Sequence, residues 1–243
     1  MTKKLMCTQR LYSKLIISFI VCIIASCSNK GKDYKDIFGQ KYIEAERYIN
    51  SNKWIQDSLA RYEIDPSLGI SIVFPELIRY SAIKDKIETR SLEVLYTQYG
   101  TKYADFSIGK FQMKPSFAYQ LEKDWDSFYE RDPIKCQIKP FNLNDNPETR
   151  RDRIIRLKDE KWQIRYLVMF LKVVEKKYKV NHCDPEMEIS FIASAYNSGY
   201  SNDSIIIVKM EKQDFFHTGI LKPKKCYNYP EISVYYYKKK CRK

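Results

Sequence analysis

The chain has 243 residues, of which 43 are Lys or Arg and 30 are Asp or Glu, so its formal net charge is +13. Hydrophobic residues make up 44% and aromatic residues 14%, which supplies a hydrophobic core and excludes a wholly disordered chain. With seven glycines and neither a G-x-G-x-x-G nor a G-x-x-x-x-G-K-[ST] sequence, the chain lacks the glycine-dependent nucleotide-binding loops.

The first 27 residues have the pattern of an export signal. Four basic residues precede the apolar run from Leu15 to Ala25, which is too short to span a membrane and has the length of a signal h-region. The run closes with Ile24-Ala25-Ser26-Cys27, which resembles the lipobox of bacterial lipoproteins. This resemblance implies cleavage before Cys27 and lipidation of its thiol. An ordinary signal peptide with a cysteine near its cleavage site is the alternative.

We therefore expect a signal peptide over residues 1–26, a lipidated cysteine and polar tether over 27–36, and one folded domain over 37–243. The expected location is the cell envelope, with the chain anchored through Cys27 to a lipid bilayer, on the periplasmic side of an outer membrane. Removal of four basic residues with the signal leaves a net charge of +9. That charge suits an anionic neighbour such as peptidoglycan, and export argues against nucleic acid as the partner.

Four cysteines remain after Cys27, and their pairing is left open by the sequence. They are Cys136, Cys183, Cys226 and Cys241. Two disulfides in an oxidising compartment and four buried thiols are both compatible with this number. We expect no metal and no cofactor, because the chain has two histidines and no C-x-x-C pair.

Helical patterns dominate the rest of the chain. Hydrophobic spacing predicts a helix over 37–62, another within 85–103 with Ile87, Leu92, Leu95 and Tyr96 inward, and a largely buried one beginning near Trp162. Three further helices are predicted to begin at a proline that follows a capping side chain. These starts are Asp65-Pro66, Asn146-Pro147 and Asp184-Pro185.

Few segments favour extended structure. Residues 100–112 are predicted to form a short hairpin or loop, and residues 126–146 an irregular excursion. No long alternating strand and no internal repeat is present. The prediction is a mostly α, single-domain fold.

Glu76 is the first candidate for chemistry. A helix that begins at Pro66 places Leu68, Ile72 and Glu76 along one line, so the carboxyl lies on an otherwise apolar face. Burial there raises the pKa of a carboxyl, as a general acid requires near neutral pH. Pro75 precedes Glu76 and should kink the helix at this point. A glutamate that bonds a free backbone NH at a helix break is the structural alternative.

Three further motifs follow in order and resemble the lytic transglycosylases of the soluble type, in the lysozyme-like superfamily that includes goose-type lysozyme. A G-x-x-Q-x-x-P segment contains Gly109, Gln112 and Pro115, and an A-Y-N-[AS]-G segment contains Tyr196 and Asn197. A late E-x-x-x-Y pair is formed by Glu231 and Tyr235. The resemblance spans residues 65–237 and implies a lysozyme-like domain with a hairpin or loop near an active-site cleft.

That resemblance implies cleavage of the β-1,4 bond between N-acetylmuramic acid and N-acetylglucosamine, with a 1,6-anhydro end on the product. Glu76 would be the catalytic acid and base, with peptidoglycan glycan strands as the partner. Gly109 would let backbone and sugar approach closely, Gln112 would bridge a sugar and the nearby backbone, and Tyr196 would orient Glu76 by a hydrogen bond. Asn197 would hold an N-acetyl group and Tyr235 would close the site.

The chain departs from the family pattern at Leu77, Lys110, Phe111 and Tyr200. Three other functions therefore stay open. A true hydrolase would need a second carboxylate, for which Asp105 and then Glu88 are the candidates. A lysozyme-like binding module would hold glycan or a protein partner without turnover, and a structural surface lipoprotein would have these motifs by coincidence.

Overall fold

The computed structural model describes residues 32–80, 82–128, 138, 141–180, 184–219 and 225–241. The signal segment 1–26, Cys27, Cys136 and Cys183 lie outside these residues, so the predictions made for them stay predictions. The chain divides into two units, Met1–Ile37 and Phe38–Lys243. The second unit carries the predicted motifs and is described below.

The described chain is mostly helical, as predicted. Its helices are α2 (Tyr34–Phe38), α3 (Gln40–Ser51), α4 (Lys53–Arg61), α5 (Pro66–Arg79), α6 (Ala82–Tyr99), α7 (Pro115–Phe128), α8 (Pro147–Lys158), α9 (Glu160–Tyr178), α10 (Pro185–Ser198), α11 (Ser204–Met210) and α12 (Tyr229–Cys241). Strands β1 (Asp214–Phe216) and β2 (Tyr227–Asn228) form an antiparallel pair. Residues 34–36, predicted as tether, belong to α2 and are therefore helical.

The three helix starts at proline are confirmed. Asp65, Asn146 and Asp184 each accept a hydrogen bond from a backbone NH of the first turn, which satisfies a donor that the helix itself leaves unpaired. These predictions succeed because a cap depends on residues only two or three positions away.

The predicted single helix over 37–62 is wrong. The segment forms α3 and α4, which meet at Asn52. The Asn52 side chain donates to the carbonyl of Tyr48 at 2.8 Å and accepts from the indole of Trp54 at 3.1 Å. Asn side chains compete with helical backbone bonds in this way, and here the competition ends one helix and begins the next.

Helix α6 covers residues 82–99, in place of the predicted 85–103. Tyr96 is buried as expected, but Leu95 is 40% exposed. The Ile87 and Glu88 side chains lie outside the described part of the chain. Helix α6 packs mainly on α8.

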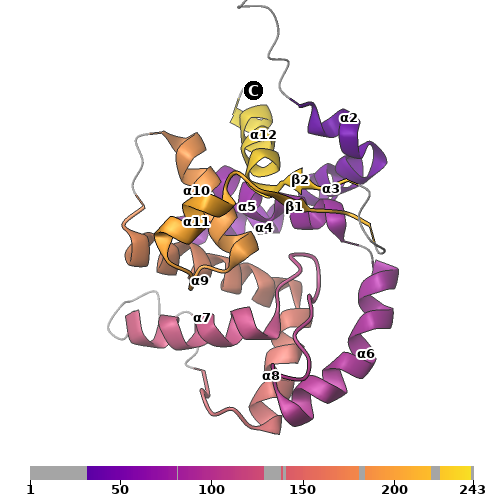
Figure 1. Ribbon diagram of the computed structural model, residues 1–243, viewed down its shortest axis with the longest axis vertical. Coiled ribbons are helices and arrows are strands. Elements are labelled where there is room, and N and C mark those ends of the chain that lie inside the picture. Colours follow the sequence, from indigo (N-terminus) through magenta and orange to yellow (C-terminus); the bar gives the residue numbers. More distant parts are fainter. Residues whose placement is uncertain are drawn as a thin grey trace, which may run out of the picture. The chain divides into compact units, whose positions relative to one another are not determined.

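The second unit contains two groups of helices joined by α9 (Figure 1). One group packs α3, α4, α10 and α12 around α5, while the other packs α6 and α7 against α8. Helix α9 contacts α4 and α5 of the first group and α7 and α8 of the second. Ten consecutive residues of α5, from Gly69 to Ile78, are buried, because helices cover it on every side.

A buried ionic network holds the second group together. Glu122 of α7 and Arg153 of α8 are both fully buried, and Arg153 Nη2 lies 2.7 Å from Glu122 Oε2. Arg156 and the Tyr166 hydroxyl both donate to Glu122 Oε1, at 3.0 and 2.5 Å. Burial lowers the pKa of Arg153, but the charge and hydrogen bonds of Glu122, together with those of Tyr96, outweigh this effect, so the pKa is raised and the guanidinium stays charged.

The predicted loop near residue 110 is a tight hairpin. Ile108 and Met113 exchange two backbone hydrogen bonds, of 2.9 and 3.2 Å. The turn between them has positive φ angles at Gly109 (70°) and Gln112 (50°). Pro115 then begins α7, so this hairpin is joined directly to a helix of the second group.

Cys226 and Cys241 are free thiols, half-buried and exposed respectively, so a disulfide between them and the burial of all four thiols are both excluded. Among the described residues, no helix has the length and apolar character needed to cross a membrane.

Candidate active site

A cavity of about 560 Å³ lies between the two groups of helices. Its walls come from α5, from the segment 105–114, from the start of α7 and from the end of α10 with the loop that follows. The lining side chains are mainly neutral polar and aromatic groups, with four charged residues among them. Among the described residues, the lining is formed by Glu76, Arg79, Asp105, Ser107, Gln112, Met113, Lys114, Ser116, Phe117, Gln120, Tyr196, Asn197, Ser198, Gly199, Tyr200 and Ser201.

Glu76 lines this cavity from the buried helix α5 and is 3% exposed. Burial raises the pKa of its carboxyl to about 7, against the opposing charges of Arg79 and Lys114. The helix continues past Pro75 to Arg79, so Glu76 lies within α5 rather than at a helix break. A carboxyl with this pKa can both give and take a proton near neutral pH.

Arg79, one turn after Glu76, places its Nη2 atom 2.8 Å from Glu76 Oε2. The two groups form an ion pair, but the N–H is not aligned with the oxygen, and Oε2 has no hydrogen-bond partner among the described residues. The same is true of the buried Arg79 Nε. The motifs in the sequence did not single out Arg79, although its i+3 spacing from an expected acid is a usable signal.

Two phenols lie near Glu76, one predicted and one not. Tyr196 donates to the carbonyl of Phe111 at 2.7 Å, and Tyr229 donates to the carbonyl of Ile72 at 2.8 Å. The predicted hydrogen bond from Tyr196 to Glu76 is therefore wrong, since the phenol hydrogen is directed to a backbone acceptor. Burial, and then the charge of Glu76, raise the pKa of both phenols well above 10, which keeps them neutral.

Gln163 of α9, a residue that the motifs did not predict, fixes the hairpin beside Glu76. Its Oε1 accepts from the NH of Phe111 at 2.9 Å, and its Nε2 donates to the carbonyls of Ile108 and Leu157 at 3.2 and 2.5 Å. The carbonyl of Phe111, which receives the Tyr196 phenol, is thereby held in place. Gly109 sits against this amide and does not line the cavity. The group that the Gly109 backbone approaches closely is therefore the Gln163 amide, where a sugar was expected.

We expect Gly109→Ala to lower the free energy of unfolding by about 3 kcal/mol. A Cβ at Gly109 would lie 1.7 Å from Gln163 Nε2, so the hairpin or the buried amide must move. Gly39→Ala is the matched control, because Gly39 also has a positive φ (52°) but open space around it. That control should cost about 1 to 2 kcal/mol, from backbone strain alone. Urea denaturation of both variants measures the difference, and equal losses would show that the collision with Gln163 is unimportant.

Asp105 is the other carboxyl on the cavity wall, and its oxygens are engaged. Oδ1 accepts from the backbone NH of Ser116 at 3.0 Å, and Oδ2 accepts from the Ser116 hydroxyl at 2.8 Å. Lys114 Nζ is 3.9 Å from Oδ2. Asp105 thus caps the first turn of α7, although it does not adjoin that helix in the sequence. This is a structural role for the candidate second acid.

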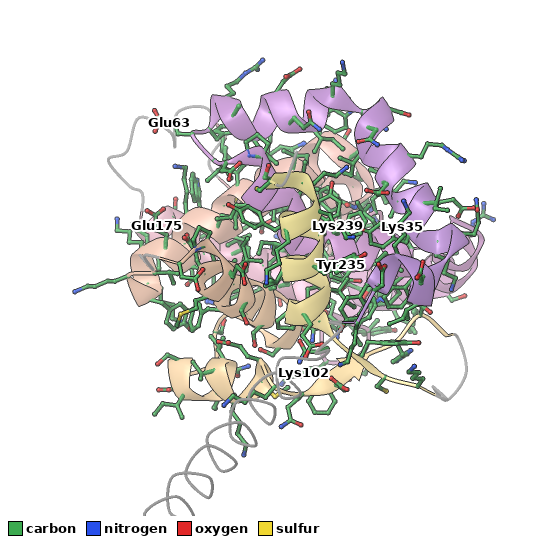
Figure 2. All side chains as sticks on the ribbon, turned by 90° about the horizontal axis from the view of Figure 1, so that it is seen from above. Lys35, Glu63, Lys102, Glu175, Tyr235 and Lys239 are labelled. Atoms are coloured by element: carbon green, nitrogen blue, oxygen red, sulfur yellow. The ribbon has the colours of Figure 1, made fainter. Side chains whose placement is uncertain are left out.

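The remaining predicted site residues divide into two sets. Gln112 and Asn197 line the cavity, and Gln112 also donates to the carbonyl of Gly109 at 2.8 Å, which agrees with its expected contact to nearby backbone. Tyr235 does not line the cavity: it lies on α12 with Lys239 (Figure 2), and its ring packs against Tyr42 at 6.0 Å. Glu231 is exposed on the same helix. Tyr229, six residues before Tyr235, is the phenol that α12 brings to Glu76.

The stability of the chain should depend on pH through Glu76. Its pKa is about 7 in the folded state, above the ordinary value of 4.5, so the unfolded chain ionises first as the pH rises. Between about pH 5 and pH 8 the wild type should lose about 3 kcal/mol of stability relative to Glu76→Gln. Urea denaturation across this range measures the loss. A constant difference between the two proteins would contradict a buried, raised-pKa carboxyl.

No group of three or more His, Cys, Asp or Glu side chains in the described residues could hold a metal ion. Comparison of the chain with protein-family models, curated proteins and solved structures found no match. The resemblance to lytic transglycosylases thus depends on the motifs of the sequence alone.

Proposed function

We propose that this chain is a peptidoglycan lytic transglycosylase in which Glu76 acts first as the acid and then as the base. The observation that carries the proposal is a single, nearly fully buried carboxyl on a cavity wall with a pKa of about 7. Few structural glutamates combine burial, a cavity and a raised pKa, and this combination marks functional sites.

The proposed reaction needs two proton transfers at one carboxyl. Glu76 gives its proton to the glycosidic oxygen, and the bond from that oxygen to C1 of the muramoyl residue breaks. The glutamate then takes the proton of the O6 hydroxyl of the same sugar while O6 bonds to C1, which closes a 1,6-anhydro ring. Glu76 ends protonated, ready for the next bond, and no water is consumed.

The state of Asp105 favours this lytic route over hydrolysis. A hydrolase uses a second carboxylate as a nucleophile or to activate water. Asp105 shares the cavity with Glu76 but accepts two hydrogen bonds from Ser116 of α7. Releasing it would leave the first turn of α7 uncapped, so Glu76 is the carboxyl better placed to react.

The cavity itself suits a carbohydrate. Neutral polar side chains, among them Gln112, Gln120 and Asn197, can bond hydroxyl and acetamido groups, and the ring of Phe117 offers apolar surface to a sugar face. The proposal includes a lysozyme-like fold, in which the two groups of helices form the sides of the cleft. It also includes a lipid anchor at Cys27, which would hold the domain close to its polymeric substrate in the cell envelope.

The test is mass spectrometry of the products released from purified peptidoglycan. Products that end in 1,6-anhydro-N-acetylmuramic acid would support the lytic reaction. Reducing ends would identify a hydrolase and direct attention back to Asp105. Retained binding of glycan with no product would identify a binding module.

A further inference from the structure

Two cations share the cavity with Glu76, and neither belongs to the motifs that suggested the enzyme. Arg79 extends from the last turn of α5, and Lys114 immediately precedes α7. Both charges act on the Glu76 carboxyl, since both lower its pKa against the larger effect of burial. Since α5 and α7 belong to different groups of helices, the two cations come from opposite sides of the cleft.

Arg79 has hydrogen-bonding capacity that the described protein leaves unused. Its side chain is 24% exposed at the cavity, and its Nε is buried without a hydrogen-bond partner among the described residues. The contact of Nη2 with Glu76 is close but poorly aligned. The ring of Phe216 lies 5.7 Å from Cζ and supports the guanidinium. A planar group of this kind binds carboxylates with two parallel hydrogen bonds.

Lys114 is available for the same ligand. Its side chain is 54% exposed, and its distance of 3.9 Å from Asp105 is long for an ion pair. Asp105 balances one cation of the cavity. When Glu76 is protonated, as its proposed role as an acid requires, Arg79 has no counter-ion among the described residues, and the described lining of the cavity carries a net positive charge.

Resting on the proposed function, we propose that Arg79 and Lys114 form an anion subsite that binds a carboxylate of the glycan substrate beside the bond that Glu76 protonates. The substrate class is thus an acidic glycan, with carboxyl groups on its lactyl ethers or on its peptide stems, rather than a neutral chitin-like one. The two sources offer the same chemistry and are separated by the experiment below.

Binding of the anion would also prepare the acid. A substrate carboxylate on Arg79 competes with the Glu76 carboxylate for the same guanidinium, so binding favours protonated Glu76. Linkage makes the effect reciprocal: protonation of Glu76 strengthens binding of the anion by the same factor. An acidic glycan would thereby convert the site to the form in which the first proton transfer can occur.

The experiment compares three substrates with the full chain: peptide-free glycan strands with free lactyl carboxylates, the same strands with these groups converted to carboxamides, and strands that keep their peptide stems. We expect conversion to carboxamide to raise KM about tenfold, the effect of losing a charge-assisted contact. A lower KM for peptide-bearing strands than for the free acids would place the bound carboxylate on the peptide.

Arg79→Gln and Lys114→Gln should each reduce the preference for acidic over carboxamide strands. Their matched controls are Arg61→Gln, at an exposed position at the end of α4, and Lys102→Gln, an exposed lysine (Figure 2) in the segment that leads to the hairpin. These controls remove the same charge away from the cavity lining and should keep the preference. Equal KM values for acidic and carboxamide strands with the wild-type enzyme would overturn the subsite while leaving the lytic reaction standing.

Direct binding decides the matter even if no strand is cleaved. Glu76→Gln leaves Arg79 without the Glu76 carboxylate as its counter-ion. At about pH 8, titration calorimetry should therefore show that this variant binds the acidic strands about tenfold more tightly than the wild type does. Adding Arg79→Gln should remove the gain. An unchanged affinity in Glu76→Gln would overturn the subsite, whereas tight binding without any cleavage would overturn the enzymatic proposal alone.

Discussion

Glu76→Gln is expected to lower the rate constant for peptidoglycan cleavage by about 10³-fold. The amide keeps the size of the carboxyl but can neither give the first proton nor take the second. Asp105 cannot replace it, because its oxygens accept hydrogen bonds from Ser116. The fold should be unaffected, since a buried carboxyl is being exchanged for a neutral group of equal volume.

The measurement is the release of soluble fragments from purified peptidoglycan, followed by liquid chromatography. Glu175→Gln is the control, because Glu175 is an exposed acid on α9 (Figure 2) and should leave the rate unchanged. Glu76→Asp should retain a small part of the activity, since it keeps the acid but shortens its reach. If Glu76→Gln released fragments at a rate near that of the wild type, Glu76 would not be the catalytic group.

Local features of the fold were predictable from the sequence. The prolines that follow a capping residue determine where α5, α8 and α10 begin. The burial of Glu76 was predicted from the apolar residues that share its face of the helix. The break at Asn52 and the exposure of Leu95 were not predicted. Both depend on which neighbours cover a helix, and a periodic pattern cannot supply that information.

The same division applies to the site. Gln112 and Asn197 belong to short motifs whose own residues form the adjacent turns. Both were predicted as site residues, and both line the cavity. The partners of Gly109 and of Tyr196 come from residues far away in the sequence, Gln163 and Phe111. The choice of Tyr235 failed for a related reason: several tyrosines occur close together near α12, and only packing against α5 selects Tyr229 as the one that faces Glu76.

Glu122→Gln is expected to lower the free energy of unfolding by about 3 to 5 kcal/mol, the usual effect of removing one partner from a buried ion pair. The variant leaves Arg153 fully buried and facing a neutral amide, and it removes the charge that Arg156 and Tyr166 also contact. Urea denaturation at neutral pH measures the loss. The comparison is Asp145→Asn, which removes the exposed partner of Arg150 and should cost less than about 1 kcal/mol.

Equal costs for these two variants would show that burial of the Glu122 network contributes nothing to its strength. The double change Glu122→Leu with Arg153→Met should lower the free energy of unfolding less than Glu122→Gln does. The double variant has no charge at position 153, whereas Glu122→Gln leaves the buried charge of Arg153 without its partner. The network also bears on the site, since Glu122 lies on α7 with Ser116, Phe117 and Gln120 of the cavity wall. Loss of Glu122 should therefore raise KM for glycan in the fraction that remains folded, while the wall formed by α5 and Glu76 stays in place.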